Sequence, residues 1–360
     1  MIMENIMIRK VLPVALLGIF VFTLCQRIKN PIYSEPEPGR RDYVWELDTL
    51  NMPMNYIGAV WGASPTDVWA VGAGGTYNDR LLHYDGTEWS TYTKESILCG
   101  GNTLFGFNAN DVWMGGGGGW GAGGGAGIWH YNGVEWREHF VYKVEGAYDI
   151  RVVDIWGTRP NDLYASGTIS FYDGVKDKWR GFVLHFNGIN WNEVVRADCE
   201  SQFLNVRKEK DRLFLFSVFI PAGGDDTFEF FELKNNTLTK IYSAAQPQIS
   251  IASMNSIDGL VYFTIDNDVF RYEKGAFNKC FSIYEKNFGH SISGRNENDI
   301  FLWMKDGIAH YNGQDIQYIY QYPRYSLNVN IYGVFFNKDV FFCASERYNN
   351  NNLIIHGKIE

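Results

Sequence analysis

The stretch YIGAVWGASPTDVWAVG, residues 56–72, decides the fold because a similar stretch recurs along the chain. LLHYDGTEWSTYT follows it at residues 81–93. Two similar pairs come next: TLFGFNANDVWMGG (103–116) with GIWHYNGVEWREHF (127–140), and VVDIWGTRPNDLYASG (152–167) with FVLHFNGINWNEV (182–194). Each pair contains four short apolar or aromatic segments separated by turn residues, and the third segment closes on His-aromatic-Asx-Gly. This pattern predicts a four-stranded antiparallel meander.

An aspartate precedes the second segment of every unit. Seven such residues lie 40 to 51 residues apart, each before an aliphatic or aromatic pair: Asp67, Asp111, Asp162, Asp211, Asp258, Asp299 and Asp339. A period of this length with four strands per unit is typical of a β-propeller. The sequence therefore predicts an all-β fold, namely a seven-bladed β-propeller of four-stranded antiparallel blades.

The last unit contains segments for three strands only, at residues 331–336, 339–345 and 353–358. The missing strand is expected from YVWELD, residues 43–48, which precedes the first unit. Its Trp45 stands 16 residues before Trp61, just as Trp89 stands 16 residues before Phe105. We therefore expect the N-terminal strand to complete the last blade and to cover a sheet edge that would otherwise invite aggregation.

The N-terminus resembles an export signal. Arg9 and Lys10 precede an apolar run from Val11 to Leu24, which is shorter than the roughly 20 residues that span a bilayer. Residues 1–25 are expected to be a signal peptide, a lipoprotein signal or an anchor. Cys25 is the candidate lipidation site, as in bacterial lipoproteins, although Leu24 stands where a small residue is typical. An uncleaved anchor is the alternative.

Residues 26–42 are expected to form a flexible tether, because SEPEPGRR resists compact structure, and residues 43–360 the propeller. Either outcome at the N-terminus places the propeller on the periplasmic or surface side of a bacterial cell envelope, tethered to the membrane by lipid or anchor only.

Composition agrees with a strand-rich fold, since aromatic residues make up 16% of the chain and glycine occurs 38 times. The formal net charge of -9, without a run of Lys and Arg, argues against nucleic-acid binding. The remaining cysteines form no C-x-x-C pair, so no zinc site is predicted and mostly free, buried thiols are expected: Cys99, Cys199, Cys280 and Cys343. No cofactor or metal is predicted, and a monomer is expected.

Five histidines occupy the same place in the third segments of their units: His83, His130, His185, His310 and His356. Equivalent positions in a ring lie too far apart to share one metal ion, so we expect these side chains to make structural hydrogen bonds. The repeated aspartates are likewise interpreted as turn residues that accept backbone hydrogen bonds. Acid-base catalysis would require one position to differ from its equivalents.

The strings WGASPTDVWAVG, LLHYDGTEW, WGTRPNDLYASG and VLHFNGINW resemble the repeats of a bacterial family of exported β-propellers built on W-G-x-S-x-x-D-V-W-A-V-G and L-H-Y-D-G-x-x-W. The likeness covers the first three units and HYNG in the sixth, while the fourth, fifth and seventh units depart from it. The resemblance implies the scaffold rather than an activity. The DGTEW turn is also similar to the Asp-box turn of sialidases, whose catalytic arginine triad and tyrosine have no match here.

The glycine-rich run from Gly115 to Gly127 leads into neither a lysine nor a helix, which excludes a P-loop. It links the second and third segments of its unit, and the corresponding loops of the first four units are expected on one face of the ring. Loop residues on a rigid scaffold commonly carry binding function. We predict that these side chains contact a ligand: Tyr77, Trp120, Phe171, Tyr172, Asp173, Lys176, Trp179, Arg180, Asp225 and Asp226.

The predicted function is a non-catalytic binding scaffold for glycan or a partner protein, acting through this loop-rich face. No catalytic residue is assigned. One alternative is a carbohydrate-active enzyme, glycosyltransferase-like or glycosidase-like, with Asp173, Asp225 or Asp226 as candidate carboxylates. Another is a structural component of an envelope complex.

Overall fold

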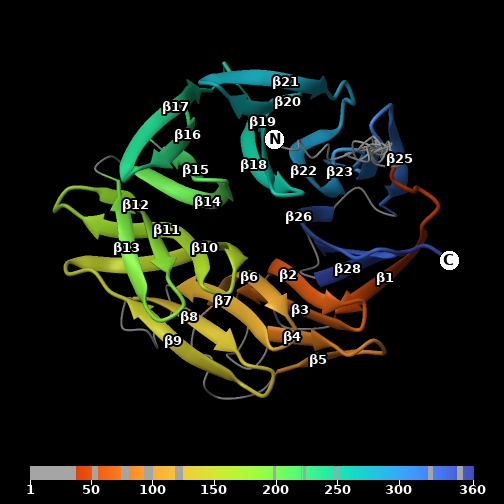
Figure 1. The fold of residues 1–360 in the computed structure, drawn as a ribbon, viewed down its shortest axis with the longest axis horizontal. Helices are drawn as coiled ribbons and strands as arrows, with labels where there is room; N and C mark the ends of the chain where they lie inside the picture. The colour runs from red at the N-terminus through yellow and green to blue at the C-terminus, as the bar shows by residue number, and fades with distance from the viewer. Residues whose placement is uncertain are drawn as a thin grey trace, which may run out of the picture. The chain divides into compact units, whose positions relative to one another are not determined.

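The structure is a computed structural model. It describes residues 38–50, 56–73, 81–92, 100–117, 125–197, 200–219, 221, 224–246, 248–249, 251–322, 327–346 and 352–360. These residues form 28 strands and no helix (Figure 1), which confirms the all-β prediction. No helix in this part of the chain is long and apolar enough to cross a membrane. The expected signal segment, with Cys25, lies outside the described residues.

Four sheets each contain four antiparallel strands in sequence order. The first consists of β2 (Tyr56–Ser64), β3 (Asp67–Ala73), β4 (Leu81–Tyr84) and β5 (Trp89–Thr91). The second consists of β14 (Ser201–Glu209), β15 (Arg212–Phe219), β16 (Thr227–Lys234) and β17 (Thr237–Ala245). The third consists of β18 (Ala252–Ile257), β19 (Leu260–Ile265), β20 (Asp268–Glu273) and β21 (Ala276–Ser282). The fourth consists of β22 (Phe288–Asn296), β23 (Asp299–Met304), β24 (Gly307–Tyr311) and β25 (Ile316–Gln321).

A larger sheet of eight strands joins two such meanders. One comprises β6 (Gly100–Asn108), β7 (Asp111–Gly117), β8 (Ala126–Tyr131) and β9 (Trp136–Tyr142). The other comprises β10 (Ala147–Arg159), β11 (Asp162–Tyr172), β12 (Asp177–Phe186) and β13 (Trp191–Arg196). A single residue pair, Arg151 with Gly117, connects β10 to β7. The eight-stranded sheet therefore consists of two four-stranded meanders whose ladders are joined by one residue pair.

The remaining sheet contains strands from both ends of the described chain. Its order is β1 (Val44–Leu50), β28 (Asn352–Lys358), β27 (Asp339–Glu346) and β26 (Leu327–Phe335). β1 pairs antiparallel with β28 from Val44 opposite Lys358 to Leu50 opposite Asn352. In Figure 1 the red strand β1 accordingly lies beside the blue strand β28. The predicted N-terminal strand thus joins the same sheet as the last three strands.

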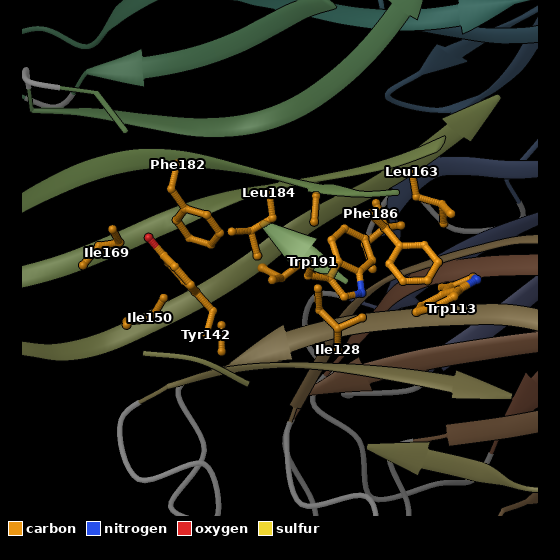
Figure 2. Close-up of a cluster of buried hydrophobic side chains, with 14 residues drawn as sticks. Trp113, Ile128, Tyr142, Ile150, Leu163, Ile169, Phe182, Leu184, Phe186 and Trp191 are labelled. Atoms are coloured by element: carbon orange, nitrogen blue, oxygen red, sulfur yellow. The ribbon is translucent and has the colours of Figure 1, made fainter. Parts of the chain in front are cut away.

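Apolar side chains fill the space between neighbouring sheets. Figure 2 shows one such cluster, in which Trp113 of β7 and Ile128 of β8 face Leu184 of β12 and Trp191 of β13. The second strand β7 is buried on both faces, whereas the last strand β13 is exposed or half-buried after Trp191. Burial of large side chains between sheets is the main stabilising contribution to this architecture.

The repeated histidines bond to the repeated aspartates. In five units the histidine Nε2 lies 2.7 to 3.0 Å from a carboxylate oxygen of the aspartate that begins the second strand: His83 with Asp67, His130 with Asp111, His185 with Asp162, His310 with Asp299 and His356 with Asp339. The aromatic residue two positions after the aspartate packs on the same imidazole, as Trp69 does on His83 at 4.2 Å between ring centroids. The structural role expected for these histidines agrees with these contacts.

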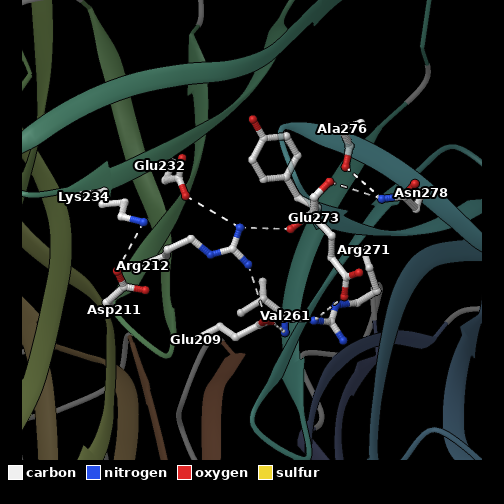
Figure 3. Close-up of polar contacts among 11 residues, drawn as sticks. Glu209, Asp211, Arg212, Glu232, Lys234, Val261, Arg271, Glu273, Ala276 and Asn278 are labelled. Atoms are coloured by element: carbon white, nitrogen blue, oxygen red, sulfur yellow. Dashed lines mark hydrogen bonds and ion pairs between the residues drawn. The ribbon is translucent and has the colours of Figure 1, made fainter.

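Two of the seven aspartates, Asp211 and Asp258, do not occupy the structural position predicted for them at the start of the second strand. Asp211 and Asp258 lie in the turns before β15 and β19, and the positions equivalent to Asp67 hold Arg212 and Leu260. Arg212 lies 3.7 Å from Glu232, which stands where the other units have histidine (Figure 3). In this unit the basic Arg212 therefore stands where the other units have aspartate, and the acidic Glu232 stands where they have histidine.

The same region connects two neighbouring sheets through buried charge. Glu209 of β14 is 4% exposed and accepts a hydrogen bond from the backbone N–H of Val261 in β19. Its carboxylate also bonds Arg271 of β20 at 2.8 Å (Figure 3). Arg212 in turn donates to the carbonyl oxygen of Tyr272 at 3.1 Å. These bonds link the β14–β17 sheet to the β18–β21 sheet, where the repeat motif is weakest.

The Asx-Gly turns between the third and fourth strands share one geometry. The side-chain oxygen of the first residue accepts hydrogen bonds from the backbone N–H groups two and three positions later, in Asp85, Asn132, Asn187 and Asn312. The glycine that follows each has φ between 87° and 96°, a region that other residues rarely adopt. This geometry explains the repeated Asx-Gly dipeptide without a catalytic role.

Replacing Asp162 with asparagine is expected to weaken the pH dependence of folding in acid. Burial raises the pKa of the Asp162 carboxyl, but hydrogen bonds from Lys208, Thr158 and His185 outweigh it and lower the pKa to about 2. Because the folded pKa lies below the unfolded value, the carboxylate stabilises the fold above about pH 4, and this contribution is lost as the pH falls toward 2. Its size is about 2 kcal/mol.

Urea unfolding at pH 7, 4 and 2.5 measures this effect. The wild type should lose more stability between pH 4 and 2.5 than Asp162→Asn, whereas the exposed control Asp225→Asn should follow the wild type. Identical pH profiles for all three proteins would contradict this assignment.

Candidate functional site

The first strands of all the meanders surround one cavity of about 330 Å³. Its lining comes from β2, β6, β10, β14, β18, β22 and β26, mostly from the second half of each strand. The lining residues are Ala59, Val60, Trp61, Gly62, Asn102, Thr103, Leu104, Phe105, Val153, Asp154, Ile155, Trp156, Arg207, Asn255, Ser256, Ser293, Gly294, Gly333, Val334, Phe335 and Phe336. A cavity of this size is at the lower end of the range for small-molecule sites.

One side of the cavity is aromatic. Trp61, Phe105 and Trp156 occupy equivalent positions in β2, β6 and β10, since each pairs with the aromatic residue that follows the repeat aspartate by two positions. Phe335 and Phe336 extend this side from the last sheet. All five rings are partly exposed. They present flat apolar surfaces on which an apolar or aromatic group can pack.

The other side is polar. The positions equivalent to Trp61 in the next three units hold Arg207, Asn255 and Ser293. Thus the same register position changes from aromatic to polar between the third and the fourth unit. These polar residues are the feature that distinguishes the units from one another inside the cavity.

Asp154 and Arg207 form a buried ion pair across the boundary between two sheets. Each residue is 6% exposed, and Nη1 of Arg207 donates to Oδ2 of Asp154. The same Oδ2 accepts the backbone N–H of Val206 at 2.9 Å, and Nη1 of Arg207 also donates to the carbonyl oxygen of Val206 at 2.7 Å. Buried charges are tolerated when they are paired and hydrogen-bonded in this way.

Asn255 extends the network to the following sheets. Its Oδ1 accepts from Nε of Arg207 at 3.4 Å, and its Nδ2 donates to the carbonyl oxygen of Ile292 at 2.9 Å. Ser293 is 5% exposed, and its hydroxyl has no hydrogen-bond partner among the described residues. Hydrogen bonds therefore hold Arg207 and Asn255 in place on the polar side, while the hydroxyl of Ser293 makes none within the described residues.

The chemistry of the cavity is that of an uncharged binding site. Asp154 and Arg207 carry the only formal charges among the described residues that line it, and they compensate each other. Across the described ranges, no group of three or more His, Cys, Asp or Glu side chains is placed to hold a metal ion. Aromatic surface beside hydrogen-bonding groups suits a ligand with apolar side groups and neutral polar atoms.

The predicted binding residues lie elsewhere. None of those that the structure describes lines the cavity. Residues 166–181, interpreted as a loop, continue β11 and β12 as a paired hairpin up to Tyr172 opposite Asp177. That interpretation was wrong, because the alternating side chains of this stretch pair as strands across a short turn. Arg180 packs over the Phe171 ring at 5.4 Å.

At the hairpin tip, Asp173 shapes the turn. Its Oδ1 accepts the backbone N–H groups of Val175 and Lys176, both at 2.9 Å, and these bonds lower the pKa of its carboxyl. Lys176 lies 3.6 Å from Glu200, and Trp179 is partly exposed on β12. The hairpin therefore places several predicted residues together, although outside the cavity.

The other predicted residues fall into two groups. Asp225 and Asp226 stand just before β16, where the carbonyl oxygen of Asp226 accepts the backbone N–H of Gln246 at 3.0 Å. Tyr77 and Trp120 lie outside the described residues, as do Cys99 and Cys199. Cys343 is buried and free as expected, whereas Cys280 is exposed, which corrects the prediction for that thiol: its strand β21 is mostly exposed to solvent.

Comparison with known proteins bears on the fold. No family model and no curated protein matches the sequence. Among solved structures, the β-propeller domain of the Trilobed protease from Pyrococcus furiosus matches with a TM-score of 0.50 and 10% identity, over 83% of this chain and 94% of that chain. The fold is a β-propeller.

Two further matches among solved structures are acylaminoacyl peptidases. The acylaminoacyl peptidase of Pyrococcus horikoshii gives a TM-score of 0.51 at 12% identity, and an acylaminoacyl peptidase in complex with Z-Gly-Gly-Phe-chloromethyl ketone gives 0.50 at 9%. Each match covers 81% of this chain and 49% of the other, so the chain spans about half the length of these peptidases. At such identities the likeness establishes the fold alone.

The comparison corrects the predicted function. The solved structures similar to this chain include two acylaminoacyl peptidases and the β-propeller domain of a protease, so the prediction of a non-catalytic scaffold for glycan or a partner protein is wrong. That prediction relied on a face of long loops, of which the third is a regular hairpin. The carbohydrate-active and envelope-component alternatives are not retained either.

Proposed function

We propose that the chain is a peptidase-type propeller of seven four-stranded blades, closed by β1, whose central cavity receives an extended peptide segment. The division of the eight-stranded sheet at its single joining pair supports the count of seven. The first strands contact one another in the order β2, β6, β10, β14, β18, β22 and β26, and β26 contacts β2. This cycle and the pairing of β1 with β28 support closure.

Closure would distinguish this propeller from one of its structural neighbours. The protease propeller from Pyrococcus furiosus is described as having an open velcro topology. Here β1 forms a full antiparallel ladder with β28, so the first and last parts of the propeller are held in one sheet. A closed ring keeps the seven first strands in register around the cavity, which suits selection of a ligand by shape.

The observation that carries the peptide proposal is the cavity itself. Its aromatic side offers Trp61, Phe105 and Trp156 to apolar side chains, and its polar side offers donors and acceptors to a peptide backbone. A protease propeller and two acylaminoacyl peptidases are among its structural neighbours, which agrees with a role in handling peptides.

Trp156→Ala is expected to weaken peptide binding about tenfold, because a central aromatic anchor commonly contributes more than 1 kcal/mol to affinity. Isothermal titration calorimetry with benzyloxycarbonyl-Gly-Gly-Phe-amide measures the effect on the full chain. Trp179→Ala, on the hairpin outside the cavity, is the matched control and should bind as the wild type does. Thermal melting establishes that both variants are folded.

Two results would contradict the proposal. One is a wild type that does not bind the peptide, and the other is an equal loss of affinity in both tryptophan variants.

Export, lipidation of Cys25 and tethering in a bacterial envelope stay predictions from the sequence, as do the monomeric state and the resemblance to exported propellers. Mass spectrometry of the mature N-terminus separates a lipidated Cys25 from an uncleaved anchor.

A further inference from the structure

We infer that the Asp154–Arg207 pair recognises the backbone of one residue of an uncharged peptide segment. This inference rests on the proposed peptide-binding function and deepens it, because it names the atoms that select the ligand. It concerns two side chains that are nine-tenths buried, line the cavity and come from adjacent sheets.

The ion pair uses only part of its hydrogen-bonding capacity. Asp154 engages Val206 and Arg207 through Oδ2, and Arg207 uses Nη1 and Nε. The hydrogen bonds that these two side chains make within the described part of the chain involve neither Oδ1 of Asp154 nor Nη2 of Arg207. A carboxylate oxygen accepts and a guanidinium nitrogen donates, so the pair offers one acceptor beside one donor group.

This arrangement complements an extended peptide. In an extended chain the N–H and C=O groups of one residue point to the same side, as they do in an antiparallel ladder. The N–H can donate to Oδ1 of Asp154 while the C=O accepts from Nη2 of Arg207. Ser293, whose hydroxyl is buried without a partner in the described structure, lines the same side of the cavity.

The compensated charges of Asp154 and Arg207 argue against a charged peptide terminus as the ligand. A free carboxylate or ammonium group would have to lose its hydration in a site whose two formal charges already compensate each other. A neutral segment with apolar side groups avoids that penalty and can pack on the aromatic side. The ligand class is therefore an uncharged peptide segment rather than a charged peptide terminus.

The first test needs no mutation. Benzyloxycarbonyl-Gly-Gly-Phe-amide is compared by calorimetry with its free acid and with three analogues, each with one backbone N–H replaced by an ester oxygen. The wild type should bind the amide about tenfold more tightly than the free acid. One ester analogue should also bind about tenfold more weakly than the amide, since its oxygen cannot donate to Asp154.

The second test changes the charge of the cavity. Asp154→Asn keeps an acceptor for Val206 but leaves Arg207 uncompensated, so the preference should reverse in favour of the free acid. Asp162→Asn, a buried substitution of the same kind outside the cavity lining, should keep the wild-type preference.

These experiments distinguish a failure of the role assigned to Asp154 and Arg207 from a failure of the proposed peptide binding. If the amide binds and Trp156→Ala weakens it, but the acid and all ester analogues bind the wild type as tightly, the role of Asp154 and Arg207 is overturned while peptide binding stands. If the wild type does not bind the amide, both fail. A reversed preference in folded Asp154→Asn supports the inference, and an unchanged preference overturns it.

Discussion

A chain that starts at residue 51 is expected to be less stable than one that starts at residue 38 by about 5 kcal/mol or more. The truncation removes β1 together with Tyr43 and Leu50, which are buried, and Trp45, which packs on the core of the last sheets. Loss of a large buried side chain costs about 2 to 5 kcal/mol. The corresponding fall in melting temperature is roughly 10 °C or more.

The N-terminal segment also holds two sheets together. Arg41 donates to the carbonyl oxygen of His310 at 2.9 Å and lies 2.7 Å from the carboxylate of Asp315. The backbone N–H of Gly39 donates to the carbonyl oxygen of Asn298 at 2.8 Å. Residues 38–50 therefore contact the β22–β25 sheet before they pair with β28, and their removal should expose an edge that promotes aggregation.

Differential scanning fluorimetry and light scattering of both chains measure this prediction. The chain that starts at residue 38 retains every one of these contacts and is the matched control. Equal melting temperatures without aggregation would contradict the role assigned to β1.

Asp154→Ala is expected to lower the free energy of unfolding by about 3 to 5 kcal/mol, because it leaves the charge of Arg207 buried and unpaired. The backbone N–H of Val206 loses its acceptor at the same time. The double variant Asp154→Ala with Arg207→Ala should lose less than the sum of the single variants, since removal of both partners leaves no uncompensated charge.

Urea unfolding of these three variants measures the coupling between the two residues. Asp225→Asn, at an exposed position, should change stability by less than about 0.5 kcal/mol. Strict additivity of the two alanine substitutions would show that the pair is not coupled.

Sequence periodicity was sufficient to predict an all-β fold of the propeller type. The aspartate spacing and the matched spacing of Trp45 and Trp61 predicted the meanders and the strand at residues 43–48, because each unit must bury the same faces against its neighbours. The periodicity was misleading in the fourth and fifth units, where other residues replace the repeat aspartate. Asp211 and Asp258 resemble the repeat aspartate in the sequence, yet the structural equivalents are Arg212 and Leu260.

The cavity was not predicted, although the repeats contain a sequence feature that indicates it, namely a change of residue type at one position of the first strands. The expectation that a functional position should differ from its equivalents was applied to the aspartates and histidines only. Applied to the first strands, it would have found the change from Trp61, Phe105 and Trp156 to Arg207 and Asn255. The Asp154–Arg207 pair joins residues 53 positions apart in different sheets, so only the packing of those sheets brings them together.

A crystal structure of the full chain with benzyloxycarbonyl-Gly-Gly-Phe-amide tests the central claim most directly. We expect electron density for the peptide inside the cavity, against Trp61 and Trp156, with one residue hydrogen-bonded to Asp154 and Arg207. Peptide bound instead at the hairpin of Tyr172 and Lys176, with the cavity empty, would contradict the account.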